Sequence, residues 1–250
     1  MMGYALFLVF VALAVYIQNL TGFALALVLL GLVGATDLFL LPDVVNVVSV
    51  IALVNAAVFL HRRGAMRLDR LLWPALACSA VGIVIGLATL DWLVGSAYEV
   101  LRLLLGISIV ACAWMLWRRA AALAQTSRPA AFMSVGLISG VMSGLFAAGG
   151  PPLVYQIYRQ PWTLARQQES LIFFFGMNAI LRLGIVVPTG SFNAQSLTLA
   201  AIAVPVVFLV TALTARRPSP LPAKVLKRFV CGLLVVTGLA MVHTSLSHLL

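Results

Sequence analysis

The chain has 250 residues, of which 63% are apolar and only 9% are charged, and its mean hydropathy is +1.13. A soluble domain could not bury that much apolar surface, and the long unbroken apolar runs lack the alternation of a transmembrane β-barrel, so the composition predicts an all-α polytopic membrane protein. The net charge of +10 comes from Lys and Arg in short loops between apolar runs, which indicates membrane topology rather than nucleic-acid binding.

Eight apolar runs of helical length follow one another along the chain. The first is interrupted by the polar stretch Gln18 to Gly22, and the fifth is interrupted by glycines and prolines. Each half of the chain therefore contains one long broken run followed by three ordinary runs. The eight runs lie at about 4–35, 43–61, 71–89, 97–117, 132–158, 168–187, 196–215 and 229–247.

The run at 132–158 is broken in its middle by Gly149-Gly150-Pro151-Pro152. Before the break, Gly136, Gly140 and Gly144 recur every four residues, so that another backbone can approach this bare helical face closely. After the break, the two prolines open a second helix, because a proline in the first turn gives up no intrahelical hydrogen bond. Half-helices that meet inside a bilayer point free amides and a positive dipole end at the joint, where an anion can bind.

The two halves of the chain indicate an internal duplication. An offset of 123 residues brings Asn55 opposite Asn178, and the broken run opens each half. We therefore expect a single transmembrane domain over 1–250, with internal repeats at about 1–125 and 126–250.

Loop charges predict which side of the membrane each loop faces. The basic loops mark one side as cytoplasmic, whereas the loops near 37–43 and 188–195 carry no Lys or Arg and are expected to be external. A single crossing by 132–158 would place the basic loop 216–228 outside, against this rule. The Lys and Arg residues of the basic loops are Arg62, Arg63, Arg67, Arg70, Arg118, Arg119, Arg128, Arg159, Arg166, Arg216, Arg217, Lys224, Lys227 and Arg228.

We therefore expect each broken run to be a re-entrant hairpin that leaves the membrane on the side where it entered. The fold is then two inverted repeats, each made of one broken re-entrant helical hairpin and three transmembrane helices. Irregular backbone at membrane depth must be covered by protein or line a cavity, so the joints should line a site. Eight simple spans with parallel halves are the alternative topology.

The stretch 136–152, GLISGVMSGLFAAGGPP, resembles the glycine-rich signature of the TauE/SafE family of membrane proteins, the sulfite exporter family. The length of the chain and its arrangement of apolar segments resemble that family as well. The chain departs from the family pattern at Ala148, where a glycine is common, and in its first half, which keeps only Gly22. The resemblance implies export of sulfite or of sulfur-containing organic anions across a bacterial cytoplasmic (inner) membrane.

Polar residues and glycines within the apolar runs are the candidate ligands. The guanidinium of Arg182 is costly to bury and suits an oxyanion, although Arg182 could instead snorkel or pair with Glu99. Asn178 lies one turn earlier on the same face, where its amide can donate to the same ligand or bridge two helices. The predicted substrate-binding residues are Gly149, Gly150, Pro151, Asn178, Arg182, Gln18, Asn19, Thr21 and Asn55; for the three from the first run, the alternative role is to cap its half-helices.

Together these features predict a secondary transporter that binds small anions at half-helix ends near the midplane and exposes them alternately to each side. An inside-negative potential drives anions outward by about 2.3 kcal/mol per charge per 100 mV. An anion channel shares the helix-end chemistry, whereas the chain lacks the Walker, H-E-x-x-H and G-x-S-x-G motifs of an ATP-driven pump or an enzyme.

The expected partners are a small anion and the lipid bilayer, and a homo-oligomer is compatible with the sequence. The three cysteines have no metal-type spacing, so neither a metal nor a cofactor is expected. The cysteines are Cys78, Cys112 and Cys231.

Overall fold

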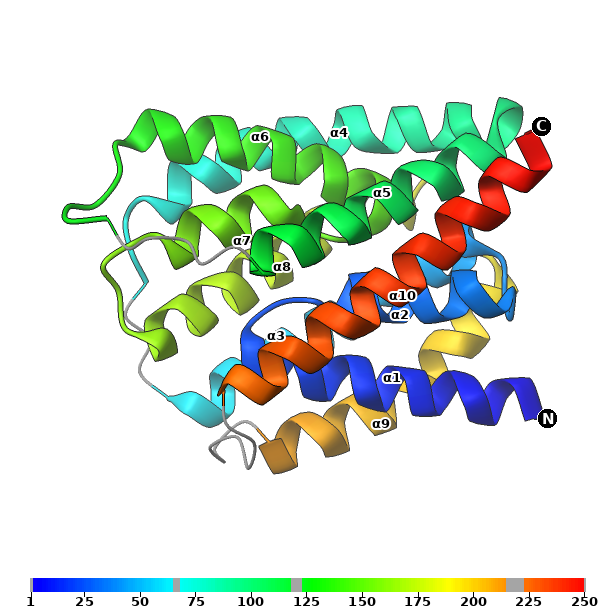
Figure 1. Ribbon diagram of the computed structural model, residues 1–250, viewed down its shortest axis with the longest axis horizontal. Helices are drawn as coiled ribbons and strands as arrows, with labels where there is room; N and C mark the ends of the chain where they lie inside the picture. The colour runs from blue at the N-terminus through cyan, green and yellow to red at the C-terminus, as the bar shows by residue number, and fades with distance from the viewer. Residues whose placement is uncertain (1, 65–67, 118–122, 215–222, 250) are drawn as a thin grey trace.

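The computed structural model describes residues 2–64, 68–117, 123–214 and 223–249, and in these ranges all the regular structure is helical. The helices run broadly along one axis of the molecule (Figure 1). They are α1 (Met2–Thr21), α2 (Leu25–Thr36), α3 (Leu41–Arg63), α4 (Leu72–Ser96), α5 (Tyr98–Trp117), α6 (Pro129–Phe146), α7 (Gly150–Tyr158), α8 (Leu164–Val186), α9 (Ala194–Thr214) and α10 (Ala223–Leu249).

Eight of the described helices, all except α2 and α7, are long and apolar enough to cross a membrane. This confirms the predicted all-α polytopic class. The two short helices arise where the sequence predicted broken runs, since 4–35 divides into α1 and α2, and 132–158 divides into α6 and α7.

The break in the first run lies later than predicted. Gln18 and Asn19 belong to α1, and the chain leaves the helix only at Gly22, whose φ is +82°. A left-handed conformation costs glycine little and ends the helix, whereas Gln18 and Asn19 keep helical backbone and use their side chains for hydrogen bonds.

Both short helices fold back along the helix that precedes them. The rings of Phe7 in α1 and Phe39 just after α2 lie 5.6 Å apart, so the first hairpin begins and ends at the same end of the bundle. The second hairpin does the same, because the backbone amide of Ser127 donates to Oε1 of Gln160 at 2.9 Å. The hairpins open towards opposite ends: α1 begins at the right-hand end of Figure 1 and α6 at the left-hand end.

The glycine stripe of α6 packs directly on the backbone of α4. A Cβ added to Gly140 would lie 2.7 Å from the Cα of Ser79, and one added to Gly136 would lie 2.8 Å from the Cα of Ala75. This is the close backbone approach that the four-residue glycine spacing predicts. Elsewhere, α1 packs on α9, α5 on α10, and α3 on both α8 and α9. Each hairpin therefore packs against a helix from the other half of the chain.

The described loop arginines gather at the end where α4, α6 and α8 begin. There Arg166 pairs with Asp69 at 2.7 Å, and Arg63 lies 4.0 Å from Glu169. At the opposite end Arg102 pairs with Asp37 at 2.7 Å. The topology prediction also used five arginines that lie outside the described residues: Arg67, Arg118, Arg119, Arg216 and Arg217.

Candidate functional site

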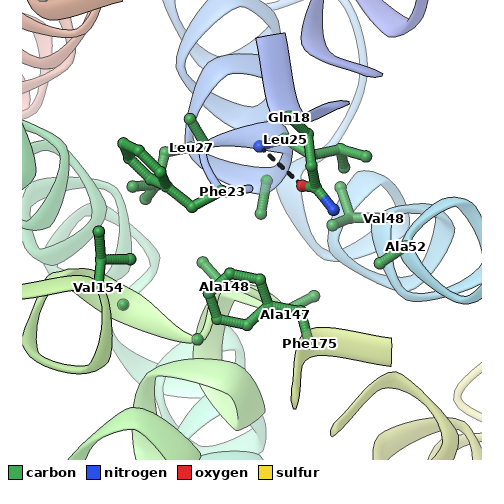
Figure 2. A pocket seen from close by; sticks show the side chains of 14 residues that line it. Gln18, Phe23, Leu25, Leu27, Val48, Ala52, Ala147, Ala148, Val154 and Phe175 are labelled. Atoms are coloured by element: carbon green, nitrogen blue, oxygen red, sulfur yellow. Dashed lines mark hydrogen bonds between the residues drawn. The ribbon is translucent and has the colours of Figure 1, made fainter. Parts of the chain in front are cut away.

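The two breaks meet at one pocket in the interior of the bundle. Figure 2 shows Gln18, Phe23 and Leu25 of the first hairpin on one side, opposite Ala147 and Ala148 of the second. The cavity has a volume of about 20 Å³, enough for about one water molecule. We call this space the joint pocket; its lining consists of Gln18, Phe23, Ala24, Leu25, Ala26, Leu27, Val48, Ala52, Ala147, Ala148, Gly149, Gly150, Val154 and Phe175.

Local hydrogen bonds and backbone conformation shape the first side of the joint pocket. Ala24 adopts a left-handed conformation with φ 83° immediately before α2. Oε1 of Gln18 accepts a hydrogen bond from the backbone amide of Leu25 at 3.1 Å and so caps α2. The hydroxyl of Thr21 donates to the carbonyls of Ile17 and Phe23 and stabilises the turn. Gln18 therefore caps a half-helix, which was its predicted alternative role, and it also lines the joint pocket.

The second side is shaped by Ala147, which is left-handed with φ 51°, and by Gly150, with φ 73°. The hydroxyl of Ser139 donates to the carbonyl of Gly149 and fixes the chain just before α7. A Cβ on Gly149 would overlap the ring of Phe175. The absence of a side chain at Gly149 thus allows this ring to pack over the joint.

Free amides are present at the start of both short helices. Within the described ranges, the backbone amides of Ala26 and Leu27 in the first turn of α2, and those of Gly149 and Gly150 at the start of α7, have no hydrogen-bond acceptor. Pro151 and Pro152 have no N–H to contribute. Pro151 lies in the first turn of α7 but does not line the joint pocket, so the expectation of a ligand at Pro151 is not met by this geometry.

Arg182 is buried, with 1% of its surface exposed. Its Nε donates to the carbonyl of Gly144 at 3.2 Å, and its Nη1 donates to Oδ1 of Asn46 and to the hydroxyl of Ser49, both at 3.0 Å. Nη2 has no partner. The two alternatives for Arg182 are wrong: its burial excludes snorkelling, and Glu99 instead lies 4.0 Å from Arg102.

Asn178 connects three helices beside Arg182. Its Nδ2 donates to the hydroxyl of Ser143 in α6 at 3.0 Å, and its Oδ1 accepts from the hydroxyl of Ser79 in α4 at 2.9 Å. Asn178 and Arg182 line a small polar pocket of about 10 Å³ next to the joint pocket. Asn178 therefore bridges helices, which was the alternative to ligand binding that the sequence suggested. It also lines the polar pocket.

Three further candidates bond to neighbouring helices away from the joint pocket. Asn19 donates to the hydroxyl of Thr214 at 2.7 Å, and Oδ1 of Asn55 accepts from the hydroxyl of Thr211 at 2.6 Å. The hydroxyl of Thr21 bonds within its own turn, and its backbone carbonyl accepts a hydrogen bond from the hydroxyl of Tyr158 in α7 at 2.6 Å. None of these three lines the joint pocket or the polar pocket. The structure thus brings together Gln18, Gly149 and Gly150 at one pocket and Asn178 and Arg182 at the next, and it separates Asn19, Thr21, Asn55 and Pro151 from both.

Sequence reasoning did not select Ser49 or Phe175, although both line the polar pocket. Ser49 follows Asn46 by three residues, so the pair forms a polar stripe on an otherwise apolar helix, and this signal could have identified it. Phe175 lies in a run of three phenylalanines that does not distinguish it from its neighbours. In the part of the chain that the structure describes, no group of His, Cys, Asp and Glu side chains could hold a metal ion.

Comparison with known proteins identifies relatives over nearly the whole chain. The model of the family described as "Sulfite exporter TauE/SafE" matches residues 6–241. A protein of Cupriavidus necator named "Probable sulfite/organosulfonate exporter TauE" is 34% identical over 236 residues, which cover 93% of this chain and 91% of that protein. No solved structure matches the chain.

Proposed function

Because the chain belongs to the sulfite exporter TauE/SafE family, we propose that it is a secondary transporter that exports a small anion. The substrate is sulfite or a small organic sulfonate, and the membrane is the bacterial cytoplasmic membrane. The eight long apolar helices and the transporter family make it an integral membrane protein and agree with a function other than catalysis.

The observation that carries this proposal is the meeting of two helix N-termini at the joint pocket. α2 begins at Leu25 and α7 begins at Gly150, and both starts line the same space. Each helix N-terminus carries about half a positive charge, and inside a membrane this charge is poorly screened. Two such ends attract an anion without placing a cation in the pocket, as in transporters built from broken helices.

We propose that α1/α2 and α6/α7 are re-entrant hairpins and that residues 1–125 and 126–250 are inverted repeats. The hairpins open towards opposite ends of the bundle (Figure 1), as inversion requires. Ala24 and Ala147 are both left-handed and are 123 positions apart, which is also the separation of Asn55 and Asn178. The packing of α6 on α4 has its counterpart in the packing of α1 on α9.

In this proposal the anion binds at the joint pocket and is exposed alternately to each side. Export of a monoanion needs no coupling ion, because the membrane potential supplies about 2.3 kcal/mol per charge per 100 mV. None of the described residues that line the joint pocket carries a carboxylate, so anion binding there requires no protonation step.

Purified protein in liposomes preloaded with radiolabelled sulfite tests the proposal. We expect saturable efflux driven by an inside-negative potential, and accelerated efflux of label when unlabelled sulfite is present on the opposite side. Gly149→Leu should abolish this flux because the side chain would fill the joint. Gly232→Leu is the matched control, since Gly232 has no neighbouring atom within 4 Å of a Cβ. Non-saturable flux without counterflow would indicate a channel, and chemically altered sulfite would indicate an enzyme.

A further inference from the structure

The joint pocket is one of three cavities that follow one another along α3 and α8. The polar pocket shares Ala147 and Phe175 with the joint pocket, and it shares Arg182 with a larger cavity of about 290 Å³. We call this larger cavity the outer vestibule; besides Arg182, its lining includes Asp43 and Asp91.

The order of the lining residues along the two helices places the cavities in a line. Along α8, Phe175 borders the joint pocket, Asn178 borders the polar pocket, and Ile185 borders the outer vestibule. Along the antiparallel α3, Ala52, Ser49 and Asp43 line the same three cavities in the same order. At 1.5 Å per residue, the seven positions from Phe175 to Arg182 span about 10 Å.

Arg182 has a hydrogen-bond donor without an acceptor in the described part of the protein. Three hydrogen bonds hold its Nε and Nη1, whereas Nη2 is buried without a partner. No carboxylate lies within salt-bridge distance of Arg182 among the described side chains. A buried cation with an unpaired donor is unfavourable until an anion neutralises it, and the fork of a guanidinium suits the oxygens of a sulfite or sulfonate group.

We propose that Arg182, with Ser49 and Asn178, forms a second anion-binding site, separated from the joint pocket by the ring of Phe175. This inference rests on the proposed function. An exported anion binds first at the helix ends of the joint pocket and then passes Phe175 to Arg182, from which it leaves through the outer vestibule. The carboxylates of Asp43 and Asp91 line that exit and repel external anions, so they favour release over rebinding.

The number of anions bound to each chain tests the second site. Radiolabelled sulfite is titrated onto purified protein in detergent, and the bound label is counted at saturation. We expect two anions per wild-type chain, one for Arg182→Gln, one for Gly149→Leu and none for the double variant. Arg182→Lys keeps the charge without the fork and should retain the second anion with an affinity at least about tenfold weaker. Thermal unfolding of each variant verifies that it is folded.

A single bound anion that either substitution removes would show one shared site and overturn the second site, as would two anions bound to folded Arg182→Gln. Absence of both sulfite binding and sulfite flux in the wild-type protein would instead refute the proposed function.

The role of Phe175 is tested by the rate at which bound label is released. Phe175→Ala should accelerate release several-fold and leave the number of bound anions at two. Phe174→Ala is the matched control, because Phe174 is an adjacent buried ring that lines none of the three cavities. Equal release rates for the two variants would overturn the assignment of Phe175 as the barrier between the sites.

Discussion

The contact between α4 and α6 allows a stability prediction with a defined magnitude, tested by Gly140→Ala. The new Cβ would lie 2.7 Å from the Cα of Ser79 and closer still to its carbonyl oxygen. These are backbone atoms, which cannot rotate away as a side chain can. The helices must therefore separate by about 1 Å, a gap that removes a quarter to a half of each van der Waals attraction along the seam.

Gly232→Ala is the matched control for this substitution. It occurs in α10, where a Cβ meets no atom within 4 Å. Both substitutions gain up to about 1 kcal/mol of helix propensity, so this gain cancels in the comparison. The remaining difference is the overpacking at α4, about 1–3 kcal/mol.

Thermal unfolding in detergent, followed by tryptophan fluorescence, measures this difference. Gly140→Ala should unfold several degrees below Gly232→Ala, since about 1 kcal/mol shifts the Tm of a chain of this size by roughly 2–4 °C. Equal midpoints for the two variants would show that the α4 and α6 backbones are not in direct contact, and the packing argument would fail.

Three further predictions concern topology and the site. Single cysteines introduced at Ser127 and Thr163 should react with a membrane-impermeant thiol reagent from the same, cytoplasmic, side; labelling from opposite sides would favour eight simple spans. Asn55→Ala should leave sulfite flux unchanged, because Asn55 bonds to Thr211 and lines neither the joint pocket nor the polar pocket; a folded variant without flux would place Asn55 in the transport path. Gln18→Leu should lower the stability by about 0.5–2 kcal/mol, because the first amide of α2 loses its cap. An unchanged unfolding midpoint for Gln18→Leu would contradict the capping role of Gln18.

Much of the fold could be predicted because it depends on short-range chemistry. The pair Gly149-Gly150 followed by prolines located the second break, and glycines at four-residue spacing identified the face of α6 that meets α4. The first break was placed too early because Gln18 and Asn19 were taken as helix-breaking, whereas both stay in α1 and use their side chains for hydrogen bonds. The lack of donors at Pro151 could have been read from the sequence alone, since proline carries no amide hydrogen.

The division of the candidate site could not be predicted in the same way. The sequence placed Arg182 and the glycine joint at a single site, but the structure puts them in neighbouring pockets. This separation depends on the position of one ring, Phe175, which is set by the packing of α3, α6 and α8 and not by any local motif. The roles of Asn19 and Asn55 depend in the same way on which helices lie beside them.

The packing of each hairpin on the opposite half has a consequence for folding and for motion. Since α6 lies on α4 and α1 lies on α9, the halves are interlaced, and neither fragment synthesised alone could complete its own contacts. Two separately translated fragments divided between α5 and α6 would have to fold around each other. A rigid rotation of one half against the other would break both contacts, so in the proposed alternating-access cycle each moving body would combine helices from the two halves.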